Sequence, residues 1–85
     1  MKVYITTKED HGYLGYGPEI GCGVDIESVH KTYEDALFNL HEKYGNLFSV
    51  ENPEAFGENI KSIYRYFDKC DEHAYEFWIY EKELA

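Results

Sequence analysis

The sequence is poor in basic residues and has no long apolar run. Only 8 of its 85 residues are Lys or Arg, against 17 that are Asp or Glu, which gives a formal net charge of −9. Nucleic acids and membrane surfaces are themselves anionic, so this charge argues against either as a direct partner and favours a basic protein surface. No apolar run approaches the roughly 20 residues that a membrane-spanning helix needs.

Cysteine is also scarce, with Cys22 and Cys70 as the two in the chain. The opening residues, MKVYITTKED, contain too short an apolar stretch for a secretory signal peptide. Two cysteines without such a signal predict reduced thiols rather than a disulfide. We therefore expect a cytoplasmic protein.

Apolar material is sufficient for folding, since 44% of the residues are hydrophobic and 18% are aromatic. This content argues against global disorder. The short length, together with the lack of any internal repeat or linker, predicts a single domain over residues 1–85.

Alternating apolar residues predict strands at residues 2–7, 24–30 and 74–84. Each strand is expected to bury one face and expose the other. The side chains expected to face the core are Val3, Ile5, Val24, Ile26, Tyr75, Phe77 and Ile79. Those expected on the exposed face of the sheet are Tyr4, Asp25, Glu27, Trp78 and Tyr80.

Two helices are predicted between the second and third strands. The first begins at Thr32, whose hydroxyl can accept a hydrogen bond from the amide of Asp35, and Gly45-Asn46 ends it, with Gly45 as a left-handed cap. The second begins at Asn52 and Pro53, an N-cap followed by a proline in the first turn. Its buried stripe is expected to contain Phe56, Ile60, Ile63, Tyr64 and Phe67.

The expected element order is β-β-α-α-β, which predicts an α+β fold. The simplest arrangement is a three-stranded antiparallel sheet with its first strand in the middle and both helices packed on one face. The opposite face would then be exposed, partly aromatic and partly acidic.

The segment HGYLGYGPEIGCG, residues 11–23, raises the question of phosphate binding. The dinucleotide-binding fingerprint requires G-x-G-x-x-G before a helix, but after Gly15 and Gly17 the third glycine, Gly21, comes one residue late and a strand follows. No Lys-Ser or Lys-Thr pair follows, and residues 9–30 include five acidic and no basic side chains. The segment is therefore not expected to bind phosphate.

Two other interpretations of this segment stay open. It could be a plain connection stiffened by Pro18. It could also be a protein-binding loop that presents Tyr13 and Tyr16 among acidic residues, because tyrosine and glycine together are typical of adaptable binding loops.

Cys70 and His73 have the spacing of a zinc-ligand pair. The residues that could complete the set are Cys22, His11, His30 and His41. The alternative is an ordinary turn with a half-buried cysteine and a solvated histidine. A Cys70 nucleophile with His73 as its base lacks an orienting group and an oxyanion site. We expect neither a metal, a cofactor nor an enzymatic activity.

Acidic residues recur two apart on two predicted strands, as Asp25 with Glu27 and Glu81 with Glu83. At about 3.3 Å per residue, each pair spaces its charges by about 6.6 Å on one face, comparable to successive nucleic-acid phosphates. This spacing indicates either nucleic-acid mimicry or a solvated acidic surface. The residues predicted to bind a partner are Tyr13, Tyr16, Glu19, Asp25, Glu27, Trp78 and Tyr80.

The runs MKVYITT, VDIESVHKTYEDALFNLHEKYG and EFWIYEKEL resemble small acidic proteins encoded by phages and other mobile elements. Some of those proteins are anti-CRISPR or anti-restriction inhibitors. The resemblance implies a non-enzymatic inhibitor in the host cytoplasm that occupies a basic, nucleic-acid-binding surface of a nuclease or other defence complex. A small zinc-binding protein and a housekeeping interaction module are the alternatives.

Overall fold

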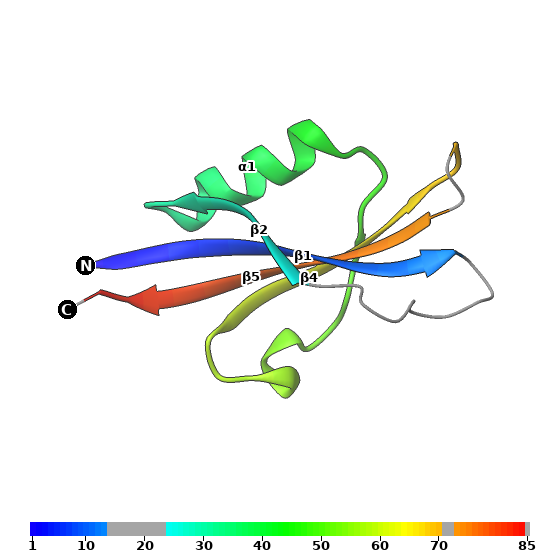
Figure 1. Ribbon diagram of the computed structural model, residues 1–85. Helices are drawn as coiled ribbons and strands as arrows, with labels where there is room; N and C mark the ends of the chain where they lie inside the picture. The colour runs from blue at the N-terminus through cyan, green and yellow to red at the C-terminus, as the bar shows by residue number, and fades with distance from the viewer. Residues whose placement is uncertain (14–23, 71–72, 85) are drawn as a thin grey trace.

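The structure is a computed structural model and describes residues 1–13, 24–70 and 73–84 (Figure 1). Its elements, in chain order, are β1 (Lys2–Tyr13), β2 (Val24–His30), α1 (Tyr33–Lys43), β3 (Phe48–Ser49), the 3-10 turn η1 (Pro53–Phe56), β4 (Ile60–Asp68) and β5 (His73–Glu83).

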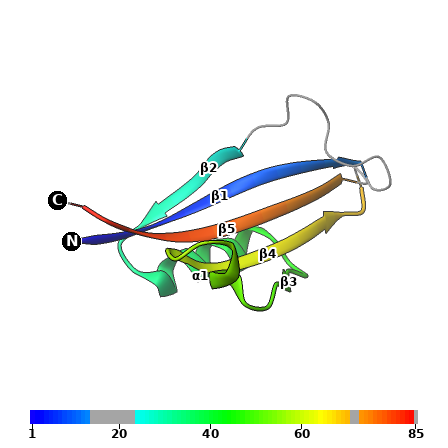
Figure 2. The same cartoon turned by 90° about the horizontal axis from the view of Figure 1, so that it is seen from below.

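The strands form one five-stranded antiparallel sheet in the order β2-β1-β5-β4-β3. Helix α1 lies on one side of this sheet and η1 lies on the other, as the two views show (Figures 1 and 2). We call the side that α1 covers the α1 face and the opposite side the open face.

The predicted three-stranded sheet with two helices is therefore wrong. Strand β1 does lie between β2 and β5, but β4 and β3 extend the sheet beyond β5. Residues 60–68 form β4 instead of a second helix, and only Pro53–Phe56 is helical, as a 3-10 turn.

The physical reason lies in the segment IKSIYRYFD. Its isoleucines and aromatic residues fit the face of a helix, but β-branched and aromatic side chains also favour strands. Gly57, which separates η1 from β4, disfavours a continuous helix. Asn52 is the N-cap residue of η1 and Pro53 follows it, as predicted, but Asn52 lies in the left-handed region at φ 55° and makes no side-chain cap bond.

Helix α1 confirms the other helix prediction. The Thr32 hydroxyl accepts a hydrogen bond from the backbone N–H of Asp35 at 3.2 Å. The helix ends at Lys43, and the residue with left-handed backbone is Asn46 at φ 54° rather than the predicted Gly45. Asparagine tolerates this conformation better than most residues that carry a side chain.

The core lies between α1 and the sheet. Ala36 and Leu40 from α1 pack with Phe77 and Ile79 from β5, and all four are almost fully buried. Burying a side chain such as that of leucine or phenylalanine stabilises a fold by roughly 1.5–3 kcal/mol. The residues that surround this cluster, partly buried, are Tyr4, Tyr33, Leu37, Tyr44, Leu47, Tyr64, Tyr66 and Tyr75.

The faces of β1 and β2 are the reverse of those predicted. Thr6 is paired with Ile79 and is buried at 1% exposure, so Tyr4 and Thr6 face α1. Val3 and Ile5 consequently lie on the open face, because successive side chains alternate across a strand. The predicted assignment failed because the alternating pattern does not itself show which face the helix covers.

Strand β2 contains a bulge opposite the Thr6–Thr7 step of β1. Thr6 pairs with Ser28 and Thr7 pairs with Ile26, which leaves Glu27 as an extra residue. A bulge of this kind re-aims the side chains beyond it. Ile26 and Val29 therefore share the open face although three positions separate them.

Candidate protein-binding surface

The open face carries a group of apolar side chains where it crosses β2, β1 and β5. Ile5 is paired with Val29 on one side and with Tyr80 on the other, so the three side chains share this face. Thr7 links Ile26 to Trp78 in the same way. The pairing register thus gathers side chains from three strands into one surface.

The turn η1 covers another part of the open face, over β4 and β5 (Figure 2). The ring of Phe56 contacts the ring of Trp78 edge-on, with centroids 5.7 Å apart. Ile63, which is paired with Trp78, is only 2% exposed. Trp78 is therefore partly used for internal packing, whereas the surface over β1 and β2 stays uncovered by η1.

The part of the open face over β1 and β2 exposes large apolar side chains. Val24 is 61% exposed, Ile26 is 68% exposed and Val29 is 55% exposed, and all three come from β2. Single exposed apolar residues are ordinary, but neighbouring ones on one face indicate an interaction site. We call this surface the open patch, and its residues are Ile5, Thr7, Val24, Ile26, Val29 and Tyr80.

A hollow of about 300 Å³ lies within the open patch. Ile5, Ile26 and Tyr80 supply its apolar wall, and its polar border consists of Thr7, Asn59, Glu81 and Lys82. Burial raises the pKa of the Tyr80 hydroxyl, and the charge of Glu9 raises it further. The apolar wall of the hollow can thus take an apolar side chain, with the phenol of Tyr80 and the charged residues Glu81 and Lys82 at its border.

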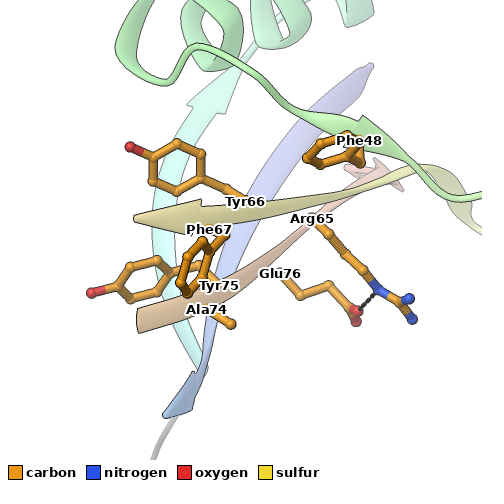
Figure 3. Close-up of a pocket in the computed structure, with 7 residues that line it drawn as sticks. All are labelled: Phe48, Arg65, Tyr66, Phe67, Ala74, Tyr75 and Glu76. Atoms are coloured by element: carbon orange, nitrogen blue, oxygen red, sulfur yellow. Dashed lines mark hydrogen bonds and ion pairs between the residues drawn. The ribbon is translucent and has the colours of Figure 1, made fainter. Parts of the chain in front are cut away.

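A second hollow, of about 170 Å³, lies beside the junction of β3, β4 and β5 (Figure 3). Phe48, Phe67 and Ala74 supply apolar lining. Glu76, only 7% exposed, accepts hydrogen bonds from Arg65 Nε at 3.0 Å and from the Trp78 indole N–H. Both carboxylate oxygens are occupied, so Glu76 holds this face together instead of offering a charge to a ligand.

The structure separates the residues predicted to form one exposed face. Trp78 and Tyr80 lie on the open face, whereas Tyr4 lies on the α1 face. Asp25, paired with Lys8, also lies on the α1 side. Glu27 accepts hydrogen bonds from Tyr44, a core-side residue, and from Lys43 of α1.

The remaining predicted binding residues belong to the glycine-rich segment. Tyr13 is the last residue of β1 and its backbone pairs with that of His73. Tyr16 and Glu19 lie outside the described residues. The protein-binding interpretation of this segment stays a prediction.

The acidic pairs are partly engaged by other groups of the same chain. Glu27 accepts a hydrogen bond from the Tyr44 hydroxyl at 2.9 Å and forms an ion pair with Lys43 at 3.5 Å. Glu81 forms ion pairs with Lys2 at 3.1 Å and Lys61 at 3.2 Å. These contacts weaken the case for regularly spaced free charges that imitate phosphates.

Hydrogen bonds from Lys2 and then Lys61 are also the main reason why the pKa of Glu81 lies below its usual value. At the same end of the sheet, Glu83 pairs with the N-terminal ammonium group at 3.1 Å. The second predicted pair of acids is therefore involved in ion pairs at both of its positions.

Cys70 and His73 flank the turn between β4 and β5. Cys70 is exposed, and the His73 ring lies 5.2 Å from the ring of Tyr75. In the described part of the chain, no three His, Cys, Asp or Glu side chains are grouped as metal ligands. Cys22, one of the residues named to complete a zinc set, is outside that part, so the zinc alternative stays a prediction.

Sequence reasoning missed Ile5, Val24, Ile26 and Val29 as surface residues. One feature of the sequence does indicate them. Strict alternation from Val24 and Ile26 would put Ser28 on the same face, but the next β-branched residue is Val29. A bulge reconciles that spacing with a single apolar face.

No known protein was found to be similar: no family model matches the chain, and neither does any curated protein or solved structure. Among the residues that the structure describes, no helix is long and apolar enough to cross a membrane. The observations that bear on function are therefore the properties of the open patch and the net charge of the chain.

Proposed function

We propose that this chain is a non-enzymatic protein-binding protein and that its partner docks on the open patch. The observation that carries the proposal is the exposure of Val24, Ile26 and Val29 together on one face. A partner that covers these side chains removes apolar surface from water, worth roughly 25 cal/mol for each Å².

The hollow in the open patch supports a specific contact within that surface. An apolar side chain of the partner would enter between Ile5, Ile26 and Tyr80. Interface energy concentrates in a few well-packed central residues, and tyrosine is frequent among them. Tyr80 is the central anchor in this proposal.

The charge of the chain supports a basic partner. At a net charge of −9, long-range attraction would accelerate the encounter with a cationic protein surface. The resemblance to mobile-element proteins supports an inhibitory outcome, in which the partner is a nuclease or other defence complex. Blocking its basic surface would then exclude nucleic acid by occupation, without chemistry.

A matched pair of substitutions tests the proposal. Ile26 on the open patch and Phe38 on α1 are almost equally exposed, at 68% and 69%. The wild type, Ile26→Asp and Phe38→Asp are immobilised separately, and proteins retained from a bacterial lysate are quantified by mass spectrometry. Circular dichroism first establishes that each variant is folded.

We expect Ile26→Asp to lose a protein that the wild type and Phe38→Asp both retain. Both substitutions add one negative charge to an exposed apolar position, so the comparison isolates the location. Retention that is unchanged in Ile26→Asp, or equally lost in both variants, would contradict docking on the open patch.

A further inference from the structure

Strand β2 is an edge of the sheet. It pairs with β1 on one side, and no other strand in the described part of the chain pairs along its outer side. Alternate backbone N–H and C=O groups of an edge strand point away from the sheet and can bind another strand. At seven residues, Val24–His30 is long enough for several such hydrogen bonds.

This edge lacks two common protections against strand pairing. Exposed edges are often blocked by lysine, proline or a bulge, and β2, VDIESVH, contains a bulge but neither lysine nor proline. Its bulge leaves Glu27 on the α1 side and keeps Val29 on the same face as Ile26. The apolar side chains along the edge therefore continue past the bulge.

We propose that the partner adds an extended strand to the outer edge of β2. The inference rests on the proposed protein-binding function and names the form that the partner takes. Strand addition draws affinity from main-chain hydrogen bonds and specificity from alternate side chains. Apolar side chains of the added strand would lie beside Ile26 and Val29 and extend the open patch.

The intervening side chains of the added strand would be basic. They fall on the α1 side, where Asp25 is exposed. Its cross-strand neighbour Lys8 directs its ammonium group over the Tyr75 ring, 4.3 Å from the centroid. Within the described residues Asp25 has no ion-pair partner, so a Lys or Arg on the added strand would complement its charge.

A second copy of this chain is a poorer fit to the same edge. Pairing β2 with another β2 would bring two sets of Asp25 and Glu27 onto one side of the joined sheet. Like charges on neighbouring strands are unfavourable, and each chain carries a net charge of −9. The charge distribution points to a foreign strand that alternates β-branched and basic residues.

Synthetic peptides test this directly. The probe is an acetylated and amidated peptide of about nine residues that alternates valine and lysine, the length of an ordinary strand. Two matched forms carry N-methyl groups on alternate residues, one form on the valines and the other on the lysines. Each form blocks hydrogen bonding along one edge of the peptide and leaves its charge unchanged.

Binding is followed by NMR of the intact chain, through amide shifts and hydrogen exchange in β2. We expect the unmethylated peptide to slow exchange of alternate β2 amides. One N-methylated form should bind at least tenfold more weakly than the other. Unchanged β2 amides at millimolar peptide, or equal binding by the two methylated forms, would overturn the inference.

Two charge reversals test the basic positions of the added strand. Asp25→Lys should weaken peptide binding about fivefold. Glu51→Lys makes the same charge change at an exposed residue between β3 and η1, toward the opposite edge of the sheet, and should change binding less than twofold. Equal effects of the two reversals would overturn the placement of the basic side chains.

The outcomes separate this inference from the proposed function. Loss of lysate retention in Ile26→Asp, with equal binding by the two methylated peptides, would retain open-patch docking and reject strand addition. Edge-specific peptide binding together with unchanged retention in Ile26→Asp would retain strand addition and reject docking on the open patch. Concentration-dependent protection of β2 amides without peptide would identify a second copy as the occupant and overturn the foreign strand.

Discussion

The hydroxyl of Tyr44 donates a hydrogen bond to Oε1 of Glu27 at 2.9 Å, and this contact joins the end of α1 to the bulge in β2. The same Tyr44 ring packs against Phe77, with centroids 4.6 Å apart. One residue therefore connects the core to β2, the strand that supplies half of the residues of the open patch. Glu27 is held on the α1 side. Strand β2 therefore presents Ile26, before Glu27, and Val29, after it, to solvent on the open face.

Tyr44→Phe removes this hydrogen bond while the ring remains. Hydrogen bonds to charged groups contribute roughly 1.5–3 kcal/mol when well shielded, and partial exposure here reduces that to about 1 kcal/mol. We expect urea unfolding to show this loss. In a double-mutant cycle with Glu27→Ala, the two substitutions should be less than additive, and strict additivity would contradict the coupling.

The raised pKa of the Tyr44 hydroxyl leads to a prediction of how stability changes at alkaline pH. Burial, followed by the hydrogen bond to Glu27 and its charge, raises the pKa of the Tyr44 hydroxyl above its usual value. The unfolded chain loses this proton near pH 10 while the folded chain keeps it. The contribution of the Tyr44 hydroxyl to the free energy of unfolding is therefore complete below about pH 10 and declines as the pH rises above it.

Unfolding midpoints measured across that range should fall less steeply for Tyr44→Phe than for the wild type. A tyrosinate absorbance titration of the folded protein should also show a hydroxyl that resists ionisation and is absent from Tyr44→Phe. Identical pH profiles for the two proteins would contradict the assignment.

The lowered pKa of Glu81 leads to a corresponding prediction of how stability changes at acidic pH. Hydrogen bonds from Lys2 and then Lys61 lower its pKa, so the associated stability is present above the ordinary glutamate pKa and is lost as pH falls through the lowered one. We expect Lys61→Ala to move the Glu81 carboxyl titration, followed by NMR, back toward higher pH. Lys43→Ala, which removes the cation beside Glu27 instead, should leave it unmoved.

The packing of α1 is tested by two residues of that helix. Leu40 is 1% exposed in the core, whereas Phe38 is 69% exposed. Leu40→Ala should cost about 2–5 kcal/mol of unfolding free energy, as is usual for deletions in a core. Phe38→Ala should change it by no more than about 0.5 kcal/mol, and similar losses in both variants would contradict the orientation of the helix.

The local signals in the sequence were most informative where one pattern had one physical meaning. Thr32 and Asp35 form the predicted N-terminal cap of α1. The alternation in residues 74–84 correctly separated Phe77 and Ile79 from Trp78 and Tyr80. In both places the residue types around the pattern favour the structure that the pattern predicts, a helix start at Thr32 and a strand over residues 74–84.

The errors arose where a pattern fitted two structures. Ile60, Ile63 and Phe67 can form a helical stripe, but the same segment is rich in residues that prefer strands, and pairing with β5 stabilises it as β4. Val24 and Ile26 were expected in the core because they are apolar. Their exposure depends on which side of the sheet α1 covers, a long-range property that alternation does not encode.

The most direct test of docking on the open patch is hydrogen exchange of the chain alone and bound to the partner that the Ile26 and Phe38 comparison identifies. We predict that binding slows exchange in Val24–His30 and in residues 3–7, with little change in Tyr33–Lys43. Protection confined to α1, with β1 and β2 exchanging as in the free chain, would contradict the central claim.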